Sequence, residues 1–170
     1  MSSSGARRGA RPVPGRRLPA ALAMARLAAL LAPAGARAIA SREPSGTLAE
    51  LAAAKRTLLL THRRDGRAVP TPVWAARAGA CLYVRTERAS GKVKRLRREP
   101  LLLVAPCTVR GEPLGAPFDA RAEILEGGEE LLAERALAAR YGLGRELFER
   151  TIDVLRIDMC YLRITPAAGG

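Results

Sequence analysis

The residues best suited to chemistry are a group of cations at the start of a predicted helix. Val93 and Leu96 have helical spacing in the segment that follows Ser90, so a helix starting there would bury these two side chains. Five cations precede the first acidic residue of this segment: Lys92, Lys94, Arg95, Arg97 and Arg98. With the two apolar residues facing inward, we expect all five cations to face outward.

This placement of positive charge is unfavourable without a partner. A helix N-terminus already carries about half a positive charge, so Lys92 and Lys94 should each cost roughly 0.3 to 1 kcal/mol unless an anion compensates them. The free backbone N–H groups after Ser90, the serine hydroxyl and the ammonium of Lys92 are together suited to binding a phosphate. The segment therefore predicts a phosphate site, with a solvated basic face as the alternative.

Upstream of this helix the sequence predicts a β-hairpin. An apolar run from Pro70 to Ala76 is followed by turn residues at 77–79 and by a second run from Cys81 to Thr86. The prolines at 70 and 72 cannot donate ladder hydrogen bonds. The first strand of the hairpin is therefore bent, lies at a sheet edge, or has one side open to a ligand.

The chain is long enough, at 170 residues, for one folded domain with an appended arm. Its formal net charge is +13, and residues 1–45 hold eight Arg against one Glu. We expect residues 1–45 to form a disordered or weakly helical basic extension. The folded domain is predicted to span 46–170, because Thr47 and Glu50 have the spacing of a helix capping box.

The extension carries a pattern that imitates a secretory signal. An apolar stretch is followed by Ala38-Ile39-Ala40 before Ser41, like a signal-peptide cleavage site. Arg26 interrupts the apolar stretch and Pro33 follows it, which argues against export and against stable membrane insertion. We expect a cytoplasmic protein.

Cysteine and histidine usage points away from a metal site. The three cysteines, at positions 81, 107 and 160, form no C-x-x-C pair and lie in apolar runs, which is typical of buried thiols in a reducing compartment. The single histidine, His62, follows a predicted strand and has no Cys, Ser or Asp nearby at a spacing typical of catalysis. We therefore expect no metal, and no catalytic residue can be assigned.

The remaining pattern predicts a mainly β fold with a few helices. Strands are expected at 57–61, 68–76, 81–86, 101–105, 118–125 and 158–165, and helices at 47–54, 90–99, 129–141 and 145–155. Helix 129–141 is expected to bury Leu132, Ala136 and Ala139. Six short strands with few helices favour a six-stranded antiparallel barrel.

The sequence lacks the common nucleotide-binding and catalytic motifs. Ser90-Gly91-Lys92-Val93 resembles the end of a P-loop, but Val93 stands where a Ser or Thr would hold magnesium. The segment beginning Gly142-Leu143-Gly144 lacks the third glycine of a dinucleotide fingerprint. No carboxylate pair stands out for acid–base work. If the domain is an enzyme, its chemistry belongs to a cofactor.

Five groups of residues, taken together and in order, carry a resemblance to a known family. They are Asp65-Gly66, Pro70-Thr71-Pro72-Val73-Trp74, Leu82-Tyr83-Val84-Arg85-Thr86, Ser90-Gly91-Lys92-Val93-Lys94-Arg95-Leu96-Arg97 and Ala105-Pro106-Cys107. The stretch 48–166 resembles the split β-barrel flavin and deazaflavin oxidoreductases. Within these it is similar to the actinobacterial branch of the pyridoxamine 5′-phosphate oxidase superfamily that uses coenzyme F420.

The resemblance implies a six-stranded split β-barrel (FMN-binding split barrel) that forms a homodimer, with cofactors at the subunit interface. It also implies cofactor-binding roles for particular residues. Ser90, Lys92 and Arg95 would hold the cofactor phosphate with Lys94 in support, Thr86 would lie beneath the ribityl chain, and Pro72, Val73 and Trp74 would line the ring.

The activity implied by the resemblance is hydride transfer from reduced F420, a deazaflavin, to an unidentified small organic acceptor. The residues do not separate F420 from FMN, because both present a phosphate and a tricyclic ring. Tyr83, Tyr141 and His62 are candidate proton donors. The alternatives are an FMN-dependent reductase or oxidase, and a non-catalytic carrier of F420 or haem. Nucleic-acid binding is not expected, because the basic residues lack interleaved aromatic residues.

Overall fold

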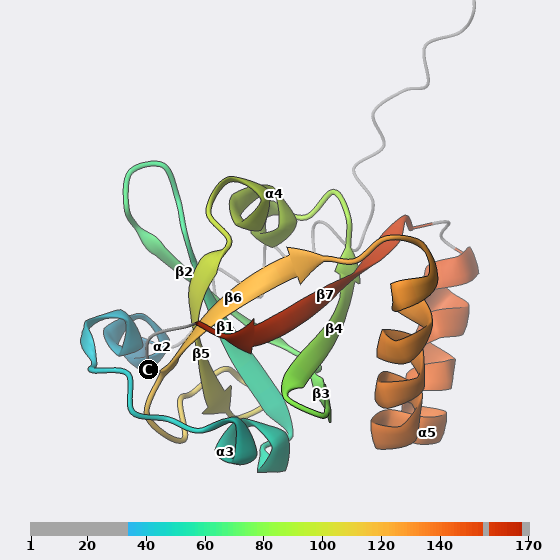
Figure 1. Ribbon diagram of the computed structural model, residues 1–170, viewed down its shortest axis with the longest axis horizontal. Helices are drawn as coiled ribbons and strands as arrows, with labels where there is room; N and C mark the ends of the chain where they lie inside the picture. The colour runs from blue at the N-terminus through green and yellow to red at the C-terminus, as the bar shows by residue number, and fades with distance from the viewer. Residues whose placement is uncertain (1–33, 155–156, 168–170) are drawn as a thin grey trace, which may run out of the picture.

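The computed structural model describes residues 34–154 and 157–167 (Figure 1). The part of the predicted basic extension that precedes residue 34 lies outside these ranges. The helices are α2 (Ala34–Ala38), η1 (Ile39–Ser41), α3 (Leu48–Ala53), α4 (Gly91–Arg98), η2 (Gly127–Glu129) and α5 (Glu130–Val154), the last bent at Gly142. The strands are β1 (Arg56–His62), β2 (Ala68–Val73), β3 (Ala76–Ala78), β4 (Cys81–Glu87), β5 (Leu101–Cys107), β6 (Phe118–Ile124) and β7 (Met159–Pro166).

The strands form one antiparallel sheet that curls into a split barrel. The order across the sheet is β2-β1-β5-β6-β7-β4-β3, with every pairing antiparallel. The two edge strands, β2 and β3, are separated in the chain only by Trp74 and Ala75. Two residues cannot cross an open seven-stranded sheet, since strands lie about 4.8 Å apart. The sheet must therefore close on itself. Where its two edges meet, at the seam of the barrel, β2 and β3 are joined by the chain and not by a ladder of hydrogen bonds.

The predicted split barrel is confirmed, with one difference in strand count. The expected strand 68–76 is broken at Trp74 and Ala75 into β2 and β3, so the sheet has seven strands rather than six. The predicted hairpin holds only for Ala76–Ala78, which pairs with the start of β4. Pro70–Val73 pairs instead with β1, at the other edge of the sheet.

The two prolines of β2 lie at positions where the sheet needs no backbone N–H donor. Pro72 is opposite Leu58 and Pro70 is opposite Leu60. Residues along an antiparallel strand alternate between bonding the partner and pointing away from it. The N–H of Arg63 donates to the carbonyl of Arg67 in the same register, so alternation directs the backbone groups of Pro70 and Pro72 to the free edge of the sheet. Of the sequence's three alternatives, an edge strand is the one observed.

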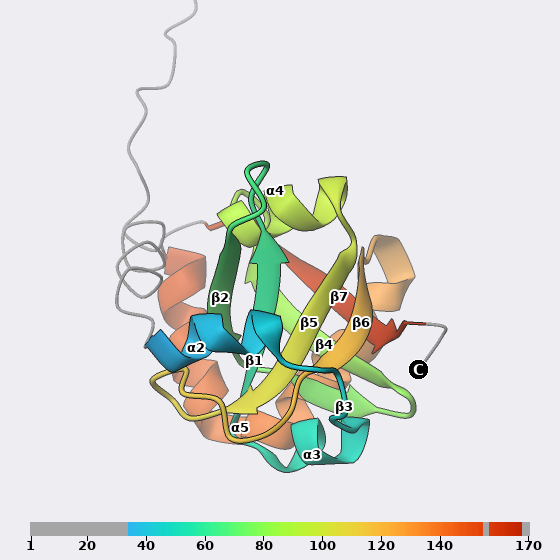
Figure 2. The same ribbon diagram turned by 90° about the vertical axis from the view of Figure 1, so that its left-hand side faces the viewer.

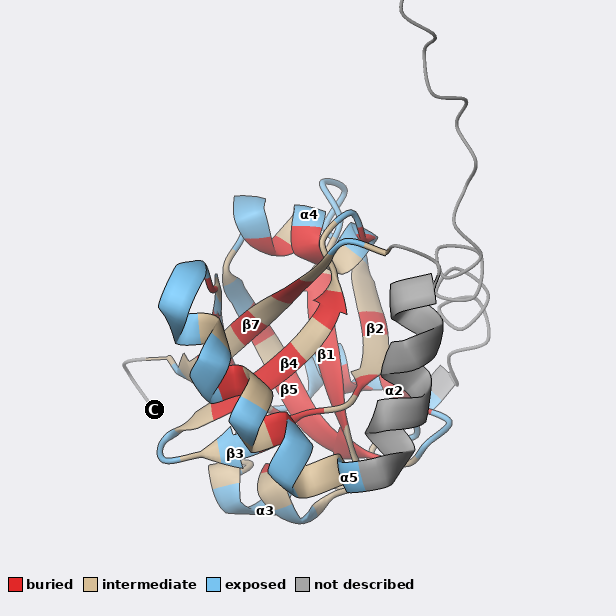
Figure 3. Ribbon diagram, turned by 90° about the vertical axis from the view of Figure 1, so that its right-hand side faces the viewer, coloured by how far each residue is buried: buried red, intermediate tan, exposed pale blue. Residues whose placement is uncertain are grey.

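The barrel interior is the main hydrophobic core, and α4 covers one end of it. Leu59, Val84 and Leu162 are fully buried inside the barrel, and Leu96 of α4 packs against the same cluster. The inward positions of Val93 and Leu96 are confirmed. Figure 3 shows buried stretches of β1, β4 and β5 gathered at the centre, with α4 across one end.

A second cluster lies on the outer face of the barrel. Ala36 and Ile39, both fully buried, pack with Leu58 and Leu60 of β1 and with the end of β5. Figure 2 shows α2 lying across this face. The segment 34–41, which the sequence placed in the extension, thus contacts the barrel directly.

We expect Ile39→Ala to lower the free energy of unfolding by about 2 kcal/mol, because the substitution removes three buried carbons and leaves a cavity under a short segment. Urea denaturation followed by circular dichroism measures this change. Ala40→Ser, at an exposed neighbouring position, is the matched control. A loss for Ile39→Ala no larger than the control's would mean that this segment adds nothing to the stability of the fold.

The predicted inner face of α5 is right at Ala136, which is partly buried, and wrong at Leu132 and Ala139. Ala133 and Leu137 are buried, whereas Leu132 is 53% exposed and Ala139 is also exposed. Leu132 and Ala136 have the same four-residue spacing as Ala133 and Leu137, so periodicity in an alanine-rich helix does not choose between these two adjacent apolar faces. The contact with Leu125 and with Tyr83 of β4, which is remote in sequence, determines which face of the helix is buried.

Candidate anion site at the start of α4

Ser90 stands at the N-cap position of α4, but its side chain does not cap the helix. Its backbone is extended (φ −64°, ψ 154°), and its hydroxyl makes no hydrogen bond to the first turn. The residue is 3% exposed, and within the described part of the chain its Oγ has no hydrogen-bond partner. A buried polar atom without a partner is uncommon and indicates that something outside the chain supplies the bond.

Lys92 does not face outward, contrary to prediction. Its Nζ donates a hydrogen bond of 2.6 Å to Oγ1 of Thr86, which is 5% exposed on β4. Burial lowers the pKa of Lys92 to about 8, with Glu87 opposing this shift and Arg95 adding to it. Helical periodicity fixes only where Cβ points. The long side chain has turned back toward the end of the barrel.

Arg95 also turns inward, toward the opposite side of the barrel end. Its Nε donates a hydrogen bond of 2.7 Å to Oγ1 of Thr61, which is 2% exposed on β1. A Cβ placed on Gly91 would lie 2.9 Å from Nη1 of Arg95, so the guanidinium lies over the first turn of α4. Burial lowers the pKa of Arg95, and the neighbouring cations Arg63 and Arg98 lower it further.

Strand periodicity places the two threonines under α4. Thr61 is two residues after Leu59 on β1, and Thr86 is two residues after Val84 on β4, so each hydroxyl continues the inward face of its strand. Both strands end beneath α4 (Figures 1 and 2). Thr61 was missed by sequence reasoning. No local signal identifies it, because its role depends on where α4 lies.

The grouped side chains fit a phosphate. They are Ser90, Lys92, Arg95, Thr61 and Thr86. The charge of Arg95 disfavours the charged form of Lys92, and neither cation has an ion pair in the described part of the chain. Two partly buried cations beside an unsatisfied hydroxyl at a helix N-terminus are best stabilised by an anion. Lys94, predicted to support them, is exposed on the other side of the helix.

The residues predicted to line the cofactor ring lie at the other end of the same sheet edge. Val73 is opposite Thr57, four residues from Thr61, which is about 13 Å along the strand. Pro72 is partly exposed and borders Gly111, whereas Val73 is 8% exposed and belongs to the barrel core. The predicted phosphate and ring contacts are thus separated along β1 and β2 and do not form one cluster.

Trp74 is held at the seam of the barrel by two neighbours. The Arg56 guanidinium lies 4.6 Å from the centre of its ring, and the Tyr141 ring stacks on it with centres 5.4 Å apart. Tyr141 also donates a hydrogen bond to the carbonyl of Ala75 (2.8 Å) and accepts one from its N–H (3.1 Å). Tyr141 therefore replaces the ladder partner that the seam lacks at Ala75.

Tyr141→Phe is expected to lower the free energy of unfolding by roughly 1 to 3 kcal/mol, because it leaves both backbone groups of buried Ala75 unsatisfied. Thermal denaturation monitored by circular dichroism tests this. Tyr161→Phe removes a different hydroxyl, bonded to Glu134, without touching the seam. Hydrogen exchange at Ala75 should speed up in the first variant only. Unchanged exchange there would contradict the assignment.

The candidate proton donors are not grouped at the anion site. Tyr83 is 4% exposed beneath α5 beside Leu125, and burial raises the pKa of its hydroxyl. The hydroxyl of Tyr141 is bonded to Ala75. His62 follows Thr61, and alternation along β1 directs its side chain to the opposite face.

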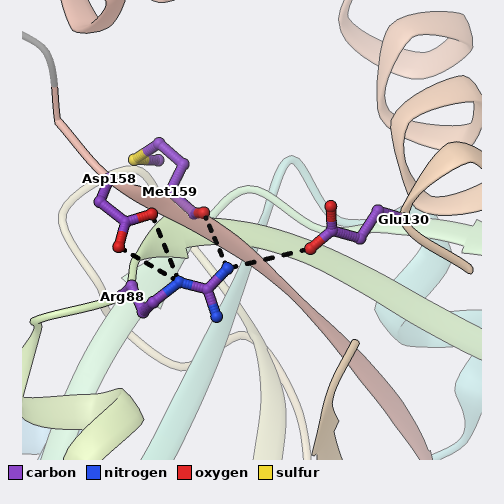
Figure 4. A network of polar contacts seen from close by, with 4 residues as sticks. All are labelled: Arg88, Glu130, Asp158 and Met159. Atoms are coloured by element: carbon purple, nitrogen blue, oxygen red, sulfur yellow. Dashed lines mark hydrogen bonds and ion pairs between the residues drawn. The ribbon is translucent and has the colours of Figure 1, made fainter. Parts of the chain in front are cut away.

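An ionic contact fixes the turn that leads into α4. Arg88 Nε lies 3.3 Å from both carboxylate oxygens of Asp158, and its Nη2 donates to the carbonyl of Met159 (3.4 Å) and lies 4.0 Å from Glu130 (Figure 4). Asp158 is exposed, and Arg88 and Glu130 are about one-third exposed, so solvent screens these contacts and their contribution to stability is small. Their effect is to hold the residues before Ser90 against β7. This network joins residues about 70 positions apart and has no local sequence signal.

Two further findings concern the described residues alone. They contain no group of His, Cys, Asp and Glu that could hold a metal ion. None of the helices within 34–154 is long and apolar enough to cross a membrane.

Comparison with known proteins identifies the fold. No protein-family model matches the sequence, and neither does any curated protein. A proposed 5-nitroimidazole antibiotic resistance protein from Bacteroides thetaiotaomicron aligns with a TM-score of 0.53 at 13% identity, over 69% of this chain and 76% of that one. A conserved hypothetical protein, Rv2991, from Mycobacterium tuberculosis aligns with a TM-score of 0.52 at 22% identity, over 72% and 82%. An F420 reductase aligns less closely, with a TM-score of 0.46 at 18% identity, over 74% and 97%. At these identities the first two alignments show a shared fold and nothing more.

Proposed function

We propose that this chain is an oxidoreductase that binds a flavin-type cofactor by its phosphate at the start of α4 and transfers a hydride from reduced coenzyme F420 to a small organic acceptor. The observation that carries this is the buried hydroxyl of Ser90, which has no hydrogen-bond partner among the described residues and lies beside two cations that form no ion pair with them. FMN on the same site is the alternative, because it presents the same phosphate.

The side chains at the barrel end would bind and orient the cofactor. Ser90 would donate its hydroxyl hydrogen to a phosphate oxygen, while Lys92 and Arg95 supply positive charge. Thr61 and Thr86 hold those two cations in place through the hydrogen bonds described above. In this proposal Thr86 also lies beneath the ribityl chain, and Lys94 adds charge from the helix surface.

The ring would lie toward the seam of the barrel. When bound, the reduced ring supplies the hydride. Pro72 and Trp74 are the side chains placed to border it, whereas the Val73 side chain is in the core and would support the ring from beneath. The free edge of β2 supports this placement, since the prolines leave carbonyl groups but no N–H donors there. The chain's task is then orientation and exclusion of water.

We also propose that the protein is a cytoplasmic homodimer, with the partner subunit covering the cofactor. Exposed apolar side chains at Leu101 (48%), Val109 (63%) and Leu114 (62%) are consistent with a protein contact. Light scattering coupled to size-exclusion chromatography measures the assembly. A monomer at micromolar concentration, with and without cofactor, would contradict this part of the proposal.

The direct test of the function has two steps. Absorbance and mass spectrometry of any small molecule that copurifies identify the ring. Reduced F420 and reduced FMN are then mixed with enones, quinones and nitroaromatics, the last suggested by the 5-nitroimidazole resistance protein of the same fold. Oxidation of the cofactor that depends on the acceptor supports an enzyme. Tight binding with no transfer to any acceptor supports a non-catalytic carrier instead.

A further inference from the structure

The surroundings of Lys92 are unusual for an ammonium group. Its one hydrogen bond in the described structure goes to a neutral hydroxyl, that of Thr86. The titratable groups that face it are Glu87 on β4, Cys160 on β7 and Arg95 on its own helix. Arg95 repels it, and Glu87 is not close enough to form an ion pair. The charged form of Lys92 therefore lacks a close counterion.

An anion bound at this position would supply that counterion. The hydroxyl of Ser90 lacks a partner two residues away, and the guanidinium of Arg95 lies over the same helical turn. A phosphate that accepts a hydrogen bond from Ser90 would lie close enough to Lys92 to attract its positive charge. The anion favours the charged ammonium, and by linkage the charged ammonium favours the anion to the same extent.

We propose that anion binding at the start of α4 is coupled to protonation of Lys92, so that the site holds its ligand tightly when Lys92 is charged and loosely when it is neutral. This rests on the proposed function in one respect only, namely that the ligand carries a phosphate. It adds to that function a dependence of ligand binding on pH.

The direction in which affinity changes with pH follows from the pKa of Lys92 in the ligand-free protein. Burial lowers the pKa of Lys92 to about 8, so below pH 8 the ammonium is already charged and affinity should not vary with pH. Above pH 8 binding must take up a proton, and affinity should fall about tenfold per pH unit until the pKa of the complex is reached. Arg95 stays charged throughout this range. Burial raises the pKa of Cys160 above its usual value, so this thiol stays neutral near pH 8.

Two measurements on the full chain test the coupling. The first follows the Lys92 side chain by NMR in ligand-free protein across the pH range. We expect a midpoint near 8, and a midpoint at the ordinary value of about 10.5 would overturn the inference. The second measures the dissociation constants of FMN and of F420 at pH 7 and pH 9. We expect roughly tenfold weaker binding at pH 9 for the ligand that binds.

Controls separate this inference from the proposed function. Riboflavin, which lacks the phosphate, should bind equally at both pH values. Lys92→Arg keeps a permanent charge and should remove the pH dependence of phosphate-ligand binding. Affinity that is independent of pH in the wild type overturns the coupling and leaves the proposed function standing. Failure of both FMN and F420 to bind at either pH overturns the proposed function and the inference with it.

Discussion

Replacing Lys92 by methionine is expected to weaken cofactor binding while stabilising the cofactor-free protein. The variant loses a hydrogen bond to a charged group, which is worth roughly 1.5 to 3 kcal/mol of binding free energy. It also removes an ammonium whose burial disfavours the charged form. We expect the free energy of unfolding at pH 7 to rise by about 1 to 2 kcal/mol, after allowing for the lost bond to Thr86.

The pH dependence of stability gives this prediction a second signature. Because the pKa of Lys92 is lowered from 10.5 to about 8 on folding, the unfolded chain binds more protons between these values. The wild type should therefore gain stability as pH rises through this window, whereas this contribution is absent from the variant. Below pH 8 the difference in stability between the two should be constant.

Isothermal titration calorimetry measures the binding and urea denaturation measures the stability. Lys94→Met is the matched control, because Lys94 is exposed one residue away on the same helix. It should change affinity by less than about 0.5 kcal/mol and raise the free energy of unfolding by less than about 1 kcal/mol, because it removes one exposed cation from the first turn of α4. Equal effects of the two substitutions would show that the orientation of Lys92 toward Thr86 is irrelevant to binding.

Leu96→Ala is expected to be the most damaging single substitution in α4. Leu96 is 3% exposed and packs against the barrel core, so its truncation should cost roughly 3 to 5 kcal/mol of unfolding free energy. The same residue anchors the turn that carries Lys92 and Arg95. Cofactor affinity should therefore fall even under conditions where the variant remains folded.

Chemical denaturation and cofactor titration of the folded variant measure the two effects. Arg97→Ala, at the exposed neighbouring position, is the control and should alter stability by less than about 0.5 kcal/mol. A folded Leu96→Ala variant with wild-type cofactor affinity would contradict the view that packing of α4 positions the site.

Local patterns predicted much of the fold because they depend on near neighbours. The capping box of Thr47 and Glu50 is present as expected, with both of its hydrogen bonds formed. The strand predicted at 158–165 is also present, and alternation along it places Cys160, Leu162 and Ile164 on the buried face. These features need only a helical or strand period, which the sequence carries directly.

The parts that escaped sequence analysis depend on distant segments. The break between β2 and β3 arises because the sheet curls until its edges meet, and neither residue at 74–75 predicts such a break. The inward turn of Lys92 and the role of Thr61 depend on α4 lying over the ends of β1 and β4. Sequence analysis found the cations of the candidate site and named Thr86, but it did not find Thr61 or the hydrogen bonds by which the two threonines orient the cations.

The central claim is that the start of α4 binds a phosphate. It is tested most directly by comparing a ring with and without that group, using FMN against riboflavin and F420 against its phosphate-free core, in the wild type and in Lys92→Met. We predict that the phosphate strengthens wild-type binding of at least one ring by 100-fold or more at pH 7, and that most of this gain is lost in the variant. Equal affinity for the phosphorylated and phosphate-free forms of both rings would contradict the claim.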